Sequence, residues 1–233
     1  MAKTTLRTLF GATLLALATL VQAQEPRVVA ITQIVEHPAL DAVYQGIKDE
    51  LAERGFKEGD NLEVMHESAQ GNSAIASQIA RKFVGESPDV IVAIATPSAQ
   101  TVAAAARNTP VIFSAVTDPL GAKLVSNLEA PGANITGVSD MLPIDKHLDM
   151  LQRVMPDAKR IGTVYNPGEA NAVSLVELLE ERLAVEAEGG QGLQGRRLEH
   201  RPLRSEGRAA PQALLELADV AAVKSSRDVE AER

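Results

Sequence analysis

The chain of 233 residues contains no cysteine and no tryptophan, and it has only two tyrosines and four phenylalanines. Without cysteine, disulfides, thiol catalysis and thiolate metal sites are excluded. The four histidines, at positions 37, 66, 147 and 200, lack the spacing of a metal site. There is no nucleophile-elbow motif, no phosphate-binding loop and no dinucleotide fingerprint. The formal charge of -8 argues against nucleic acid as a partner, because an acidic surface repels phosphate backbones.

The first 23 residues have the pattern of an export signal. Lys3 and Arg7 precede an apolar run at residues 9–21, and Val21-Gln22-Ala23 resembles a small-residue cleavage site. A membrane anchor is the alternative, but the run falls short of the roughly 20 residues that span a bilayer. Cleavage would remove Lys3 and Arg7 but no acidic residue, and would change the formal net charge from -8 to -10. No cysteine follows the cleavage site, so we expect a periplasmic protein that is soluble after cleavage rather than a lipoprotein.

Strand-like and helix-like segments alternate over most of the remaining chain. Strands are predicted at residues 28–34, 61–66, 90–94, 110–113 and 135–139, and the first of them is β-branched and nearly continuous. Between these strands, apolar residues at helical spacing predict three helices. The first runs from residue 40 to a stop signal at Arg54-Gly55, the second follows Ser73 as its candidate cap, and the third runs from Thr96-Pro97 to residue 107. This alternation predicts a parallel sheet covered on both faces, which makes residues 24–143 a first α/β lobe.

A second α/β lobe is expected to begin at residue 144. A helix at 144–154, a strand at 160–165 and a helix at 172–186 are predicted, so that 144–183 is the start of this lobe. The segment 184–233 is Gly- and Arg-rich at first, and no strand of the earlier β-branched type is expected after Tyr165. One explanation is a flexible linker before a short helix at 211–223. The favoured one is a lobe left incomplete by truncation or a reading-frame error, because a parallel sheet needs more than one strand.

Small polar residues follow four of the predicted strands, at the edge of the sheet where ligands collect. Thr96 can cap its helix and Pro97 suits the first turn, so the free N–H groups near Ser98 would favour a carboxylate or phosphate. The alternative is an ordinary capped helix with nothing bound. His37 could be a base, a ligand contact or a neighbour of a helix cap. Asp118 and Glu169 could be an acid/base pair, a grip for an amine, or partners in salt bridges.

Five segments of the chain resemble the periplasmic substrate-binding proteins of ABC transporters of the tryptophan/tyrosine-binding type. They are QIVEHPALD at 33–41, ATPSAQ at 95–100, AVTDP at 115–119, NITGVSD at 134–140 and YNPGEAN at 165–171. They occur in the order of that family and cover about residues 27–180. The resemblance implies an α/β fold of the type I periplasmic-binding-protein kind, here with one flavodoxin-like parallel-sheet lobe and an incomplete second lobe. It implies that the ligand contacts are Gln33, His37, Thr96, Ser98, Thr117, Asp118, Asn166, Glu169 and Asn171.

In such a site Thr96 and Ser98 would suit a ligand carboxylate, and Asp118 or Glu169 its amino group. The resulting hypothesis is a non-enzymatic solute-binding protein that delivers a small amino-acid-like ligand to an ABC transporter membrane permease, without cofactor or metal. One alternative is an exported α/β hydrolase-like enzyme that uses His37 and Asp118 for acid/base chemistry. Another is a non-functional remnant whose first lobe folds but holds no ligand. A repressor of the same two-lobe fold would need a basic DNA-reading module where the export signal stands.

Overall fold

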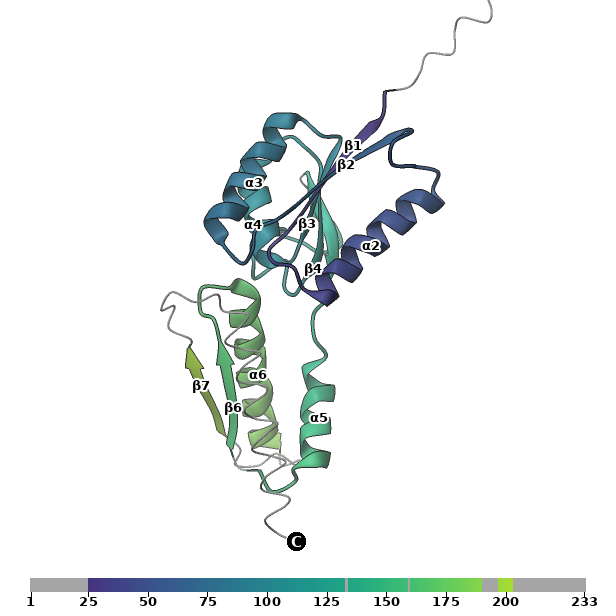
Figure 1. The fold of residues 1–233 in the computed structure, drawn as a ribbon. Coiled ribbons are helices and arrows are strands. Elements are labelled where there is room, and N and C mark those ends of the chain that lie inside the picture. The colour runs from purple at the N-terminus through teal and green to yellow at the C-terminus, as the bar shows by residue number, and fades with distance from the viewer. Residues whose placement is uncertain (1–24, 133, 159, 190–196, 203–233) are drawn as a thin grey trace, which may run out of the picture.

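The computed structural model describes residues 25–132, 134–158, 160–189 and 197–202. Within these residues, strands and helices alternate in two lobes, one above the other in Figure 1. The expected export signal at 1–23 and the expected helix at 211–223 lie outside the described residues. None of the described helices combines the length and the apolar character that a membrane crossing requires.

The first lobe is a five-stranded sheet with helices on both faces. Its neighbouring strands are all parallel, in the order β2-β1-β3-β4-β5. The predicted α/β class and the parallel sheet are therefore confirmed. The elements are β1 (Arg27–Gln33), α2 (Pro38–Glu53), β2 (Leu62–Ser68), α3 (Ser73–Glu86), β3 (Val90–Ile94), α4 (Thr96–Ala105), β4 (Val111–Val116) and β5 (Ile135–Ser139).

Both faces of this sheet are buried at its centre, in β1 and β3, which explains why these two strands are almost continuously apolar. On one face Val29 and Ile31 of β1 pack with the apolar residues of α2. On the other face Ala30 packs with α3 and α4, around the fully buried Phe83. Figure 1 shows α2 on one side of the sheet and α3 and α4 on the other. The carboxyl ends of β1, β3 and β4 therefore meet at one edge, between the two layers of helices.

The predicted helix starts are correct in position but wrong in their caps. The cap of α3 is Asn72 and not Ser73, since the Asn72 Oδ1 accepts the N–H groups of Ala74 at 2.8 Å and Ile75 at 3.2 Å. Helix α4 starts directly after Ala95, and no side chain caps it, so that Thr96 is its first residue and not its cap. This leaves the Thr96 hydroxyl available for another partner.

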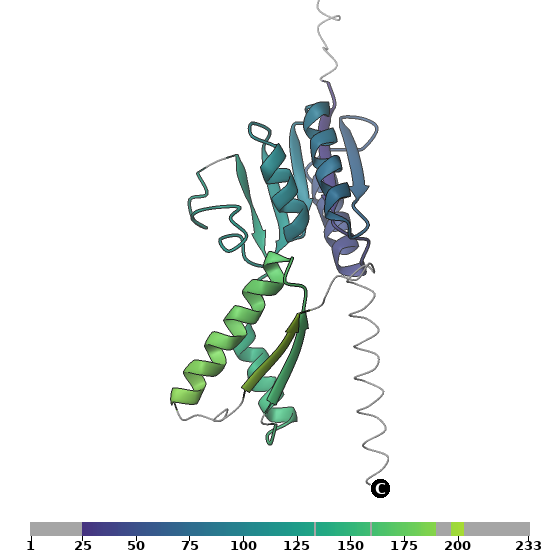
Figure 2. The ribbon, with the colours of Figure 1, turned by 90° about the vertical axis from the view of Figure 1, so that its left-hand side faces the viewer.

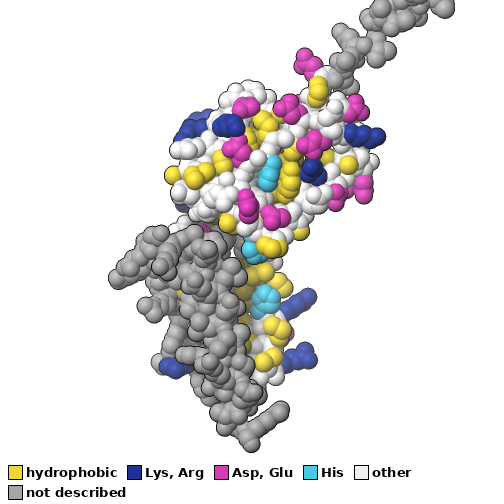
Figure 3. All heavy atoms as spheres, viewed as in Figure 1, with side chains coloured by type: hydrophobic (Ala, Val, Ile, Leu, Met, Phe, Trp, Pro, Cys, Tyr) yellow, Lys and Arg dark blue, Asp and Glu magenta, His cyan; other side chains and the backbone are white. Residues whose placement is uncertain are grey.

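The second lobe consists of α5 (Ile144–Val154), β6 (Arg160–Tyr165), α6 (Ala170–Gly189) and β7 (Arg197–Pro202). β7 runs parallel to β6 and is a strand that the sequence pattern did not predict. Its sequence RLEHRP has a single aliphatic residue, Leu198, which packs with the small core around Leu148 and Leu183. Hydrophobic side chains are visible along α5 in Figure 3, and the Val154 side chain is 72% exposed.

The two lobes touch where α6 begins. Ala170, the first residue of α6, packs against the core of the first lobe. In Figures 1 and 2 this end of α6 lies against the lower end of the first lobe, below the carboxyl ends of its strands. The loops that follow β4 and β6 are thereby brought to the boundary between the lobes.

Candidate functional site

Three buried hydroxyl groups without partners mark the carboxyl ends of β1 and β3. The Oγ1 atoms of Thr32 and Thr96 and the Oγ of Ser98 have no hydrogen-bond partner in the part of the chain that the structure describes. These side chains are 1%, 2% and 0% exposed. An unpaired buried hydroxyl costs on the order of 1–3 kcal/mol. Two of them lie in the first turn of α4 and the third lies near the end of β1. Buried unpaired hydroxyls of this kind are typical of a place that a polar ligand completes.

The backbone at the same edge adopts conformations that residues other than glycine rarely adopt. Ala95, between β3 and α4, has φ 75° and ψ 154°, and Ala115, near the end of β4, has φ 52°. Such conformations cost on the order of 1–3 kcal/mol each and concentrate at functional sites. The two segments are held together, because the Ala95 N–H donates to the Ser114 carbonyl oxygen at 2.9 Å.

Gln33 is fully buried and is held from several sides. Its Nε2 donates to the Asp41 Oδ1 at 2.9 Å and to the Val35 carbonyl oxygen at 3.2 Å. Its Oε1 lies 3.4 Å from the His66 Nε2. The His66 ring stacks on Tyr44 with the ring centroids 4.0 Å apart. Gln33 therefore joins β1, α2 and β2 behind the strand ends, which favours a positioning role in addition to the predicted ligand contact.

His37 caps a helix, and Asp118 closes a backbone turn. The His37 Nδ1 accepts the Ala39 N–H at 3.2 Å, which makes His37 the N-cap of α2. The Asp118 Oδ1 accepts the N–H groups of Leu120 at 3.1 Å and Gly121 at 2.9 Å. One acceptor atom of each side chain is thus engaged, while the Asp118 Oδ2 remains available to a ligand.

The pKa of His66, which lies behind Gln33, is displaced from its usual value. Burial lowers the pKa of the His66 imidazole, and the carboxylates of Asp41 and Glu36 only partly oppose this effect. The neutral imidazole is therefore favoured in the folded protein. Among the described residues, no cluster of histidine and acidic side chains is suited to hold a metal ion.

The second-lobe residues predicted for the site lie together in one cavity of about 410 Å³. Asn166, Glu169 and Asn171 contribute its polar lining, and Tyr165, Leu175 and other apolar residues of α5, β6 and α6 line the rest. The Asn166 Nδ2 donates to the Glu169 Oε1 at 2.9 Å. The Asn171 Oδ1 is buried without a partner among the described residues. The size and the mainly apolar lining suit a small organic ligand.

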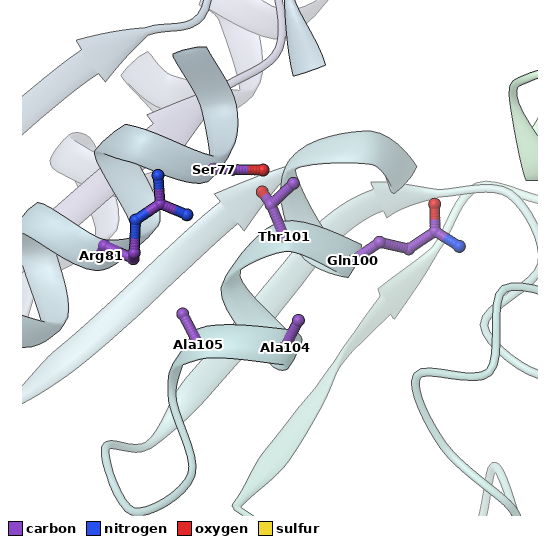
Figure 4. A pocket seen from close by; sticks show the side chains of 6 residues that line it. All are labelled: Ser77, Arg81, Gln100, Thr101, Ala104 and Ala105. Carbon is purple, nitrogen blue, oxygen red and sulfur yellow. The ribbon is translucent and has the colours of Figure 1, made fainter. Parts of the chain in front are cut away.

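A second cavity, of about 340 Å³, lies between α3 and α4 on the outside of the first lobe. Figure 4 shows its lining side chains, which include Arg81 and Thr101, and none of the predicted site residues is among them. The Thr101 Oγ1 donates to the Ser98 carbonyl oxygen at 2.9 Å. Because its lining includes none of the predicted site residues, this cavity is not assigned to the strand-end site.

The predicted site residues thus fall into two groups at the facing ends of the two lobes. Gln33, His37, Thr96, Ser98, Thr117 and Asp118 belong to the first lobe, and Asn166, Glu169 and Asn171 line the cavity of the second. Sequence reasoning missed Thr32, Asp41 and His66. Thr32 could have been noticed as a polar residue inside the apolar run of β1, whereas the other two meet Gln33 only through the fold.

Comparison with known proteins gives consistent matches. Residues 28–187 match the family model described as ABC transporter substrate binding protein. A curated relative, a tyrosine-binding protein of Clostridioides difficile, is 43% identical over 153 residues, which are 66% of this chain and 44% of the relative.

Two crystal structures are similar over 77% of this chain and 58% of their own. A conserved domain protein from Vibrio cholerae is 52% identical with a TM-score of 0.71. An ABC domain from Streptococcus pneumoniae in complex with L-Trp is 35% identical with a TM-score of 0.69. The chain therefore spans less than half of the curated relative and 58% of each solved chain.

Proposed function

The chain belongs to the ABC transporter substrate-binding proteins, and from that premise we propose that it binds a small amino-acid-like ligand between its two lobes for an ABC import system. The sequence resemblance over residues 27–180 and the expected type I periplasmic-binding-protein fold class agree with this family. The observation that carries the proposal is the set of hydroxyls of Thr32 in β1 and of Thr96 and Ser98 at the start of α4, which are buried without a partner among the described residues.

The first-lobe group fits the carboxylate of an amino acid. Hydroxyl groups and the free N–H groups of a helix N-terminus both donate hydrogen bonds, and the helix dipole favours negative charge there. Thr96 and Ser98 would donate to the carboxylate, and Thr32 would add a third hydroxyl from β1. Gln33, His37 and Thr117 would border this part of the site.

The second-lobe group, together with Asp118 of the first lobe, fits the rest of such a ligand. The amino group would be held by the Asp118 Oδ2 or by the Glu169 Oε2, since the other oxygen of each carboxylate is already hydrogen-bonded. Asn166 and Asn171 would supply further polar contacts. The apolar lining by Tyr165, Leu175 and their neighbours would accept an apolar or aromatic side chain, as the relatives that bind tyrosine and L-Trp suggest.

The cellular role follows from the same proposal. Residues 1–23 would direct export and be removed, and the protein would act in the periplasm and deliver its ligand to a membrane permease. No catalytic step is proposed: the His37 Nδ1 accepts an N–H of its own helix, and Asp118 closes a backbone turn. These contacts do not favour the hydrolase alternative.

Calorimetry with L-tryptophan, L-tyrosine and L-leucine tests the proposal on the folded chain. We expect stoichiometric binding of at least one of them, without turnover, and weaker binding by Ser98→Ala. Ser77→Ala is the matched control, because the Ser77 hydroxyl lies in α3 and donates to the Ser73 carbonyl oxygen at 2.9 Å. A folded chain that gives no heat with any of these amino acids would instead favour the non-functional remnant.

A further inference from the structure

Gly121 lies in the loop after β4, at a point where no side chain fits. A Cβ atom at this position would lie 2.2 Å from the Asp118 Oδ2, 2.9 Å from the Asp118 Cγ and 2.9 Å from the Ser174 Oγ. Ordinary contacts of a Cβ atom begin at about 3.4 Å. Gly121 is not among the residues with positive φ, so room rather than backbone conformation requires glycine here.

The first of these neighbours, Asp118, cannot easily move away. Its Oδ1 accepts two backbone N–H groups, one of them from Gly121 itself at 2.9 Å. The loop is also fixed from α4, since the Gln100 Nε2 donates to the Ala122 carbonyl oxygen at 3.2 Å, and Ala122 is buried in the core. A methyl group at position 121 would therefore displace the Asp118 carboxylate by about 1 Å or break its turn.

The second neighbour, Ser174, belongs to the other lobe. It lies in α6, one turn after Asn171 and five residues after Glu169, both of which line the second-lobe cavity. Ala170 of the same helix packs on the first lobe. The contact between Gly121 and Ser174 thus joins the loop that carries Asp118 to the helix that carries the second-lobe group of the site.

We propose that Gly121 and Ser174 are positioning residues that set how closely the two halves of the ligand site approach each other. The inference rests on the proposed function and extends it to residues that do not themselves hold the ligand. The absence of a side chain at 121 lets α6 come near enough for both lobes to contact one small molecule. Binding constellations need a geometry accurate to about 0.5 Å, and a methyl group at 121 would intrude by about that much on the Ser174 Oγ, which it would approach to 2.9 Å against an ordinary 3.4 Å.

The cysteine-free chain allows the spacing of the lobes to be measured directly. Spin labels on Gln78→Cys in α3 and Glu177→Cys in α6, both exposed, report the distance between the lobes by electron double resonance. We expect Gly121→Ala to lengthen or broaden this distance and to weaken L-tryptophan binding at least tenfold. Gly46→Ala is the control, because a Cβ atom there has nothing within 4 Å, and it should change neither quantity.

Ser174→Gly provides the rescue. Combined with Gly121→Ala it removes one of the two clashes, so the distance should return toward that of the parent chain. Should Gly121→Ala not fold, Ser174→Leu enlarges the same contact from the other lobe and should separate the lobes likewise. An unchanged distance in Gly121→Ala, or no recovery in the double variant, would overturn the inference. The distance requires no ligand, so a chain that fails to bind L-tryptophan refutes the proposed function without deciding this test.

Discussion

Replacement of Thr96 by valine should raise stability and lower affinity, which is an unusual pair of effects. Valine keeps the shape of threonine and replaces the hydroxyl by a methyl group. The Thr96 Oγ1 is buried without a described partner, so its removal relieves a desolvation cost on the order of 1–3 kcal/mol. We expect the free energy of unfolding to rise by about 1 kcal/mol, as measured by urea denaturation of the ligand-free protein.

Ligand binding should change in the opposite direction. A hydrogen bond to a carboxylate contributes about 1.5–3 kcal/mol, so its loss should weaken binding roughly tenfold to a hundredfold. Calorimetric titration with L-tryptophan and L-tyrosine measures this effect.

Thr101→Val is the matched control, since it makes the same chemical change five residues further along α4. The Thr101 hydroxyl donates to the Ser98 carbonyl oxygen at 2.9 Å, so its loss should destabilise the fold by about 1 kcal/mol. Affinity should stay within about twofold, because no ligand contact is assigned to Thr101. If Thr96→Val is destabilising, the hydroxyl has a partner in the free protein. If it leaves affinity unchanged, Thr96 does not contact the ligand. Either result would refute the reasoning.

Three further predictions concern the scaffold around the site. Phe83→Ala, which empties a fully buried position, should lower the free energy of unfolding by about 3–5 kcal/mol in urea denaturation. Gly137→Ala should cost about 1–3 kcal/mol, because its Cβ atom would lie 2.0 Å from the Phe113 carbonyl oxygen, whereas Gly162→Ala, with open space around it, should avoid this cost. The lowered pKa of His66 predicts stability that is complete above pH about 6.5 and declines as the pH falls below it through the folded-state pKa. His66→Gln should flatten this decline in denaturation curves recorded from pH 8 to pH 5; an equally steep decline would contradict the assignment.

The first lobe could be predicted almost entirely from the sequence. Its central strands are buried on both faces, and such strands leave nearly continuous runs rich in β-branched residues, such as 28–34 and 90–94. The helix caps were harder to predict from the sequence. Asn72 and Ser73 are both good caps, and only the backbone decides which of two adjacent polar residues receives the N–H groups.

The second lobe was harder to predict because its last strand is stabilised by contacts between residues that are distant in the sequence. β7 forms against β6 after the long helix α6, and its sequence RLEHRP has little strand character by itself. Pairing with a neighbouring strand and packing of Leu198 on the small core stabilise it instead. Hydrophobic periodicity cannot detect a strand of this kind.

By itself, the sequence determined the α/β class, the order of the elements in the first lobe and the strand ends where the polar residues gather. These properties follow from local patterns of hydrophobicity, glycine and proline. The tertiary structure alone decided which of those polar groups are engaged in caps, as His37 is, and which, like the Ser98 hydroxyl, are buried without a partner in the described part of the chain. It also decided that Gly121 faces Ser174 across the boundary of the lobes. Burial and contact between residues distant in sequence depend on how the elements pack, and no local pattern records that.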